Sequence, residues 1–84
     1  MKSVTVYSAD WCPYCDAAKR LLGQRGIPYE EINVDRIPGF RQKLIELTGQ
    51  RTVPQIIIDD QPVGGFQELA ALDRAGKLAE LVGA

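Results

Sequence analysis

The stretch Trp11-Cys12-Pro13-Tyr14-Cys15 holds both cysteines of the 84-residue chain and separates a strand-like segment from a helix-like one. Because proline lacks a backbone N–H and has φ close to the helical value, Pro13 suits the first position of a helix. Cys12 is then predicted to be the N-cap, within reach of the unpaired N–H groups of the first turn. Cys15 follows about one turn later and is predicted to lie deeper in the protein.

The predicted N-cap position favours the charged form of the Cys12 side chain. Hydrogen bonds from the helix start and the positive end of the helix dipole both stabilise a thiolate. The thiolate is the nucleophilic form of cysteine, and Cys-x-x-Cys motifs have the pKa of their first cysteine lowered to roughly 3.5–7.5. The pattern therefore predicts a dithiol that is oxidised and reduced.

Size and charge indicate one globular domain over residues 1–84. A net charge of −1 gives no electrostatic reason to expect nucleic acid or a membrane surface as partner. No apolar run reaches the length of a membrane span, and the N-terminus lacks the features of a signal peptide. We therefore expect a cytoplasmic protein, in which a permanent structural disulfide would be unusual.

The absence of histidine excludes Cys-His hydrolase chemistry and every zinc site that contains histidine. The two cysteines alone would supply half of a zinc site, so a metal would have to be shared between two copies of the chain. That arrangement remains an alternative to redox use. Redox use is favoured because Cys-x-x-Cys next to a βαβ pattern is typical of thioredoxin-like proteins.

Hydrophobic periodicity and glycine or proline breaks predict the order β-α-β-α-β-β-α. The predicted strands are 4–7, 29–34, 55–59 and 62–64, and the predicted helices are 13–25, 38–48 and 66–74, followed by a helical turn at 77–82. Pro38 is predicted to open the second helix, and Ile37 is assigned to its inner face. Asp60-Gln61 is the predicted turn of a hairpin between the last two strands.

Three motifs in the same order resemble the glutaredoxin family over nearly the whole chain. They are Cys12-Pro13-Tyr14-Cys15, Thr52-Val53-Pro54-Gln55 and Gly64-Gly65. The resemblance implies the α/β thioredoxin fold, a four-stranded mixed sheet flanked by three helices, with a short C-terminal helical turn. It also implies a glutathione-dependent oxidoreductase that reduces protein disulfides and glutathione mixed disulfides. Glutathione would be a co-substrate, with no tightly bound cofactor and no metal, and the protein would be a monomer.

The resemblance assigns a role to each cysteine. Cys12 would attack a disulfide sulfur and form a mixed disulfide with the substrate or with glutathione. Cys15 would resolve a protein mixed disulfide, or remain unused while a second glutathione resolves it.

The segment around Pro54 is predicted to present backbone groups to a ligand. A residue before proline is extended, so Val53 would offer its N–H and C=O to an added peptide strand. The residues alone favour an ordinary connecting turn with trans proline. The resemblance implies instead a cis bond at Pro54 and an edge, with Thr52, that holds the cysteinyl part of glutathione.

Gly65 and the start of the third helix are predicted to form an anion site. By resemblance, the backbone N–H groups of Phe66 and Gln67 would bind the γ-glutamyl carboxylate of glutathione, and Glu68 its ammonium group. Tyr14 is also assigned to the glutathione site. The alternative is a hairpin exit and a helix cap without a ligand.

Some positions depart from the family. Many glutaredoxins carry a lysine where this chain has Ala9, so Arg51 is expected to take over the glycyl carboxylate of glutathione, and Lys19 to add positive potential. Phe66 after the glycine pair resembles glutaredoxin-like electron donors to ribonucleotide reductase, which thioredoxin reductase reduces. Such an electron donor is the second hypothesis for the function, after the glutathione-dependent oxidoreductase. The third is an iron–sulfur or zinc-binding dimer, which Pro13 is expected to disfavour because it stiffens the helix start.

Overall fold

The computed structural model describes residues 1–83; the predicted domain also includes Ala84, which lies outside the described residues. The helices and strands follow the predicted order, and the final helical turn is the short helix α4. The elements are β1 (Val4–Ser8), α1 (Pro13–Gln24), β2 (Glu30–Asn33), the 3-10 turn η1 (Val34–Arg36), α2 (Phe40–Thr48), β3 (Gln55–Ile58), β4 (Gln61–Gly64), α3 (Phe66–Arg74) and α4 (Leu78–Val82).

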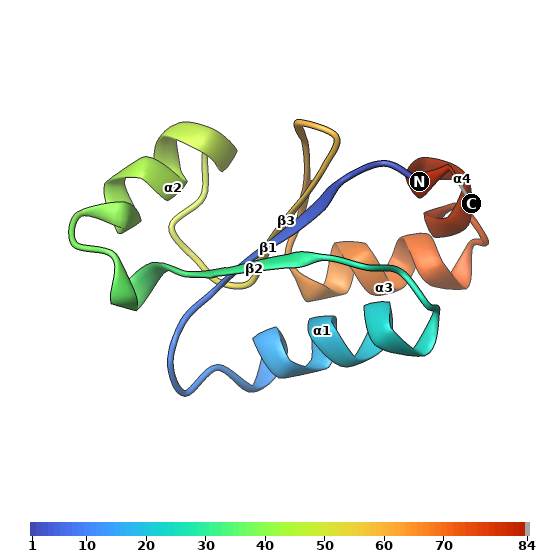
Figure 1. Cartoon of the computed structure of the whole chain (residues 1–84), viewed down its shortest axis with the longest axis horizontal. Helices are drawn as coiled ribbons and strands as arrows, with labels where there is room; N and C mark the ends of the chain where they lie inside the picture. The colour runs from blue at the N-terminus through green and yellow to red at the C-terminus, as the bar shows by residue number, and fades with distance from the viewer. Residues whose placement is uncertain (84) are drawn as a thin grey trace.

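The four strands form one mixed sheet in the order β2-β1-β3-β4, which confirms the predicted thioredoxin-type arrangement. β2 runs parallel to β1, and β3 is antiparallel to both β1 and β4. A parallel pair needs a crossover connection, which α1 provides. Figure 1 shows α1 and α3 side by side under the sheet and α2 on its other side. The start of α1 therefore lies at the end of the central strand β1.

Both faces of the sheet are covered by apolar side chains. Leu22 of α1 and Leu69 of α3 pack with Val6 and Ile56 in the larger cluster, and all four are fully buried. On the other face, Tyr7 packs with Leu44 of α2 in a smaller cluster. The alternation of side chains along β1 thus fixes the strand between two layers and holds the dithiol end of the chain in place.

Two predicted boundaries are wrong. α2 begins at Phe40 and not at Pro38, because Gly39 adopts a left-handed conformation with φ of 75° directly before it. Ile37 is 43% exposed and does not belong to the inner face of that helix. The hairpin turn is Asp59-Asp60, one residue earlier than predicted, with φ of 49° and 68°. Two positive φ values suit the twist of a two-residue hairpin.

None of the helices within residues 1–83 is long and apolar enough to cross a bilayer. The cytoplasmic address stays a prediction.

Candidate functional site

Cys12 is the N-cap of α1 and Pro13 its first residue, as the sequence predicts. The Sγ atom of Cys12 accepts a hydrogen bond of 3.1 Å from the backbone N–H of Cys15. The N–H of Asp16 donates to the carbonyl oxygen of Cys12 over 3.2 Å, which closes the first turn. The sulfur of Cys12 therefore lies where the helix start stabilises negative charge.

The two cysteines are joined in a disulfide, so the structure represents the oxidised form of the pair. Cys15 is 1% exposed, whereas Cys12 is partly exposed, which confirms that the second sulfur lies deeper. An incoming disulfide can therefore reach Cys12 and not Cys15. This asymmetry suits a pair in which one sulfur attacks and the other resolves.

A groove of about 210 Å³ next to the dithiol, here called the loop groove, brings together almost all the predicted glutathione residues. Its lining is Tyr14, Thr52, Val53, Pro54, Gly65, Phe66, Gln67 and Glu68. Arg51 is exposed and is not among these lining residues. The Val53–Pro54 peptide bond is cis, as the family resemblance implies. The rings of Tyr14 and Phe66 face each other at 6.0 Å between centroids.

At the start of α3, Glu68 turns back to cap its own helix. Its Oε1 accepts a hydrogen bond of 2.7 Å from the N–H of Gly65. The side chain passes so close to Gly64 that an added Cβ there would lie 2.8 Å from Oε1, and Gly64 also has a φ of 119°. The N–H of Gly65 is thus already paired, while the next N–H groups of the helix have no partner within the helix itself.

Gln55 is a supporting residue to which the sequence analysis gives no role. It is 3% exposed, and its Nε2 donates to the Thr52 hydroxyl over 3.2 Å. Its Oε1 has no hydrogen-bond partner in the described residues. A buried amide directly after Pro54 is unusual in an apolar strand, and that contrast is the signal that could have identified it. Its contact with Thr52 fixes one wall of the loop groove.

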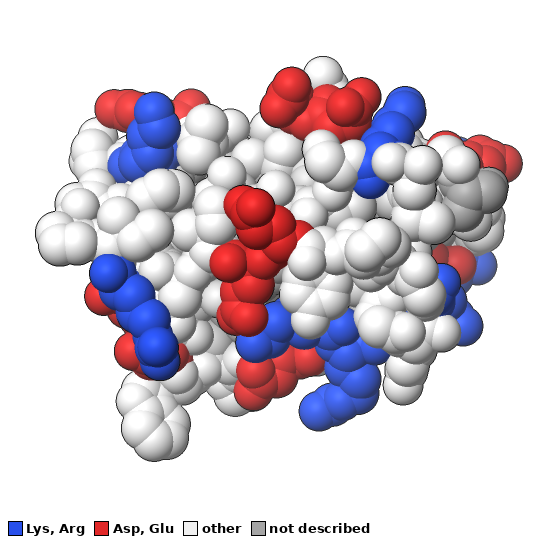
Figure 2. Space-filling model, viewed as in Figure 1, with Lys and Arg blue, Asp and Glu red and all other residues white. Residues whose placement is uncertain are grey.

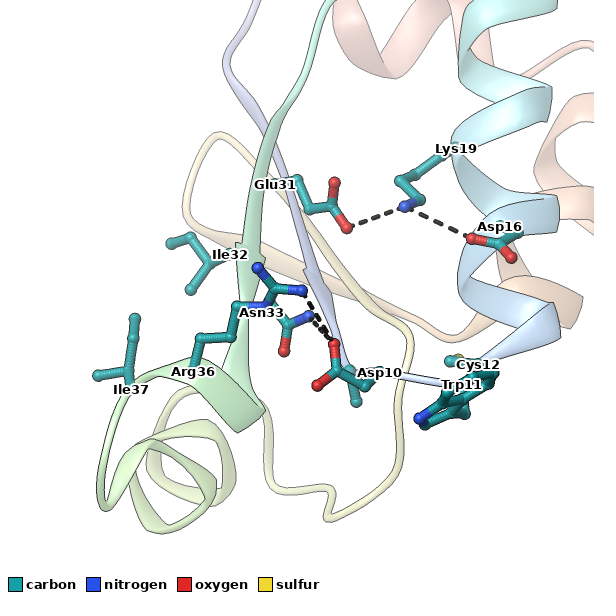
Figure 3. Close-up of a pocket in the computed structure, with 11 residues that line it drawn as sticks. Asp10, Trp11, Cys12, Asp16, Lys19, Glu31, Ile32, Asn33, Arg36 and Ile37 are labelled. Atoms are coloured by element: carbon teal, nitrogen blue, oxygen red, sulfur yellow. Dashed lines mark hydrogen bonds and ion pairs between the residues drawn. The ribbon is translucent and has the colours of Figure 1, made fainter.

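A second groove of about 710 Å³, here called the edge groove, also opens beside Cys12 and shares no lining residue with the loop groove (Figure 3). Its lining is Ala9, Asp10, Trp11, Cys12, Asp16, Lys19, Glu31, Ile32, Asn33, Arg36 and Ile37. These residues come from the β1–α1 connection, α1, β2 and the segment that follows β2. The sequence analysis does not predict this groove.

Charges in the edge groove are paired with one another. The Nζ of Lys19 lies 2.9 Å from Glu31 and 3.5 Å from Asp16 (Figure 3). The pKa of Glu31 is lowered, first by the hydrogen bond that the Ser8 hydroxyl donates over 2.7 Å and then by Lys19. The hydrogen bond to Glu31 raises the pKa of Lys19. Two carboxylates therefore offset the positive potential expected from Lys19.

Within residues 1–83, no three Cys, Asp or Glu side chains lie close enough together to hold a metal ion.

Comparison with known proteins agrees with this geometry. The Glutaredoxin family model matches residues 4–63. A glutaredoxin of Pseudomonas aeruginosa is 46% identical over 84 residues, covering 100% of both chains. Glutaredoxin 3 of Escherichia coli K12 is 42% identical, covering 98% of this chain and 99% of the relative.

Solved structures give the same result. The buckwheat glutaredoxin–glutathione complex superposes with a TM-score of 0.90 at 32% identity, covering 98% of this chain and 77% of that one. The solution structure of glutaredoxin from Brucella melitensis superposes with a TM-score of 0.86 at 40% identity, covering 100% and 94%. With its Cys12–Cys15 pair at a helix start, the chain belongs to the glutaredoxin family of glutathione-dependent thiol-disulfide oxidoreductases.

Proposed function

We propose that Cys12 is the nucleophile of this enzyme and that Cys15 is the resolving cysteine. The Cys12 thiolate attacks one sulfur of a disulfide, forms a mixed disulfide and releases the other sulfur as a thiolate. With a protein substrate, the Cys15 thiolate then attacks Cys12 Sγ and releases the second substrate sulfur. With a glutathionylated protein, Cys12 takes the glutathione, and a second glutathione removes it as glutathione disulfide.

Glutathione is proposed to lie in the loop groove. Its cysteinyl backbone pairs with Val53, supported by Thr52 and the cis bond at Pro54. The supporting observation is that three segments far apart in the sequence line one groove next to the Cys12 helix start. A solved relative, buckwheat glutaredoxin, is described as a complex with glutathione.

The two ends of glutathione are assigned by charge. The γ-glutamyl carboxylate lies at the N–H groups of Phe66 and Gln67, since the first N–H groups of a helix bind anions. The second carboxylate oxygen of Glu68 receives the ammonium group, because Oε1 already caps Gly65. Tyr14 covers the glycyl side. Arg51 lies next to the groove in sequence and is proposed to swing toward the glycyl carboxylate.

A comparison of reductants tests this function. The oxidised protein is mixed either with glutathione and glutathione reductase or with thioredoxin reductase, and the reduction of a glutathionylated peptide is followed by NADPH consumption. We expect rapid turnover with glutathione and little with thioredoxin reductase. Cys12→Ser is the matched control and should be inactive in both. Rapid turnover only with thioredoxin reductase would contradict glutathione dependence.

The second candidate is a glutaredoxin-like electron donor, for example to ribonucleotide reductase, that is reduced by thioredoxin reductase. It is favoured by the low positive charge around the dithiol, where Ala9 replaces the common lysine and Lys19 is paired with Glu31 and Asp16. The same comparison of reductants tests this candidate, which predicts rapid turnover with thioredoxin reductase and little with glutathione.

The third candidate is a dimer that holds an iron–sulfur cluster or zinc, whereas we propose that the protein is a monomer in solution. Anaerobic purification followed by metal analysis tests it, since a cluster-bearing dimer would be coloured and would contain sulfide, whereas a zinc-bearing dimer would be colourless and would contain zinc.

A further inference from the structure

The edge groove has no part in the proposed binding of glutathione, yet it opens on the same sulfur. Cys12 belongs to its lining, and no residue of the loop groove does. Figure 3 shows that the groove reaches along β2 from Cys12 and Trp11, on the side of α1, to Ile32 and Ile37, which lie on the other side of that strand. A molecule that fills this groove would reach the nucleophile from a side that glutathione leaves free.

The walls of the edge groove are held in place before any ligand arrives. The Oδ1 of Asp10 accepts hydrogen bonds from Asn33 over 2.9 Å and from Arg36 over 3.5 Å. The backbone N–H of Asp10 donates to Asp35 over 3.1 Å. These contacts fasten the β1–α1 connection, which leads to Cys12, to the end of β2. A groove with fixed walls loses little conformational entropy when it binds a partner.

The charge of the groove points to a basic partner. Its lining contains three carboxylates (Asp10, Asp16 and Glu31) and two cations (Lys19 and Arg36), an excess of one negative charge. Both cations are already paired inside the groove, and the side chain of Asp16 is 67% exposed. Figure 2 shows acidic side chains in the middle of this face, over β2. Electrostatic complementarity therefore favours Lys or Arg on the partner and disfavours phosphate groups.

The shape of the groove suits an extended polypeptide. β2 is an edge strand, so half of its backbone groups face away from β1. At the Cys12 end, the indole of Trp11 is 99% exposed and its φ is 56°, and at the other end Ile37 is 43% exposed. An exposed indole beside a nucleophile is typical of a surface that a protein partner covers.

The spacing sets where the basic residue would be. The hydrogen bond from the Asp16 N–H to the Cys12 carbonyl places Asp16 one helical turn beyond the sulfur-bearing residue. One turn rises about 5–6 Å, which an extended chain spans in about two residues. A lysine two residues from the reacting cysteine would therefore meet the Asp16 carboxylate.

We propose that the edge groove docks the protein disulfide substrate as an extended segment that carries Lys or Arg about two residues from its reacting cysteine. The proposal rests on the function proposed above. Cys12 Sγ bonds to the substrate cysteine, the substrate S–S bond breaks, and the other sulfur leaves as a thiolate. The Cys15 thiolate then forms the Cys12–Cys15 disulfide seen in the structure and releases the substrate as a dithiol, so that two electrons pass from enzyme to substrate.

Two disulfide-linked peptide dimers test the proposal. They share one sequence with a single cysteine, flanked at both second-neighbour positions by Lys in one and by Glu in the other. The ratio of their kcat/KM values is measured for the wild type, Asp16→Asn, Asp16→Lys and Glu80→Lys. Glu80→Lys is the matched control, since it makes the same change in net charge at an exposed position of α4, and the ratio cancels differences in the intrinsic reactivity of the peptides.

We expect Asp16→Lys to lower the Lys/Glu ratio by about three- to fivefold, Asp16→Asn to lower it less, and Glu80→Lys to leave it at the wild-type value. The ratio should also fall in the wild type as salt rises. Equal ratios in Asp16→Lys and Glu80→Lys would overturn the proposal. Reduction of a glutathionylated peptide is measured in parallel: if the wild type performs it but does not discriminate between the dimers, the edge groove proposal alone fails. If the wild type cannot reduce the glutathionylated peptide, the glutathione-dependent function proposed above fails.

Discussion

The loop groove and the edge groove lie beside the same sulfur but are built from different parts of the chain. The loop groove consists of short contiguous segments, Thr52–Pro54 and Gly65–Glu68, with Tyr14 of α1. It presents backbone groups, a cis peptide bond and one helix start. The edge groove is lined by side chains from several elements, five of them charged, which ion pairs and hydrogen bonds hold together.

This difference has a functional meaning. Backbone groups pair with the main chain that every peptide-like ligand has and do not read its side chains. The loop groove therefore suits a small peptide-like molecule that is always the same. Charged side chains on an edge strand discriminate between partners of different sequence. One nucleophile could thereby serve a constant reductant on one side and variable protein substrates on the other.

The largest expected effects come from substitutions of the two cysteines, because Cys12 serves both reactions and Cys15 serves only the reduction of protein disulfides. Cys12→Ser should abolish the reduction of both glutathionylated peptides and protein disulfides, because both reactions need its thiolate. Cys15→Ser should keep most glutathione-dependent activity and lose most protein-disulfide reduction, because only the latter needs the resolving sulfur. Steady-state rates with both substrates measure this. Equal losses of both activities in Cys15→Ser would contradict the assigned roles.

The next effect acts on the loop groove through Gly64. Gly64→Ala should reduce the free energy of unfolding by about 1–3 kcal/mol, because Cβ would have to displace the Glu68 side chain at a φ of 119°. It should also raise KM for glutathionylated substrates, since Glu68 lines the groove.

Gly23 provides the control for this prediction. It lies within α1, and an added Cβ would meet nothing within 4 Å. Gly23→Ala should therefore stabilise the protein by about 0.5–1 kcal/mol. Denaturant unfolding distinguishes the two signs, and a neutral Gly64→Ala would contradict the prediction, since neither the displacement of Glu68 nor the φ of 119° would then carry a cost.

A smaller effect is expected from Tyr14, whose ring is 61% exposed and faces Phe66 across the loop groove. Tyr14→Ala should raise KM for glutathionylated peptide by about three- to tenfold, the range of an aromatic contact. Tyr14→Phe keeps the ring and should stay near the wild type. If both substitutions raise KM by the same factor, the hydroxyl and not the ring makes the contact.

The contrast between the grooves also explains what the sequence could predict. The dithiol turn and the N-cap at Cys12 were predictable because proline and cysteine act locally, and their spacing specifies the backbone. The residues of the loop groove were named only by resemblance to glutaredoxins, since the residues alone favoured a trans bond at Pro54. α3 was predicted with its observed bounds, Phe66–Arg74. The start of α2 was not, because Gly39 can take a left-handed conformation after Pro38 and so delay the helix.

The edge groove was beyond local inference. Its ion pairs join residues such as Lys19 and Glu31, whose meeting depends on the parallel pairing of β1 with β2. The sequence contains many possible partners for each charge, and only the packed sheet decides among them. Likewise Arg51, although adjacent to Thr52, does not line the loop groove, and its role stays a prediction.

The smallest effect concerns the Ser8–Glu31 contact on the edge groove. Ser8 is 1% exposed, and its hydroxyl bond is the main reason that the pKa of Glu31 is lowered. A carboxyl with a lowered folded-state pKa contributes stability above its unfolded pKa, and that contribution is lost as pH falls through the folded pKa. Ser8→Ala should therefore destabilise the protein at pH 7 by no more than about 1 kcal/mol, and this deficit should shrink as pH falls through the folded-state pKa of Glu31, where the carboxylate that Ser8 stabilises is lost. Thermal unfolding of the wild type, Ser8→Ala and the exposed control Ser3→Ala measures this from about pH 7 to about pH 3, a range that includes the ordinary pKa of a glutamate side chain. A Ser8→Ala deficit that stays constant over this range would mean that Ser8 acts by packing alone, and the edge groove would lose one of its electrostatic supports.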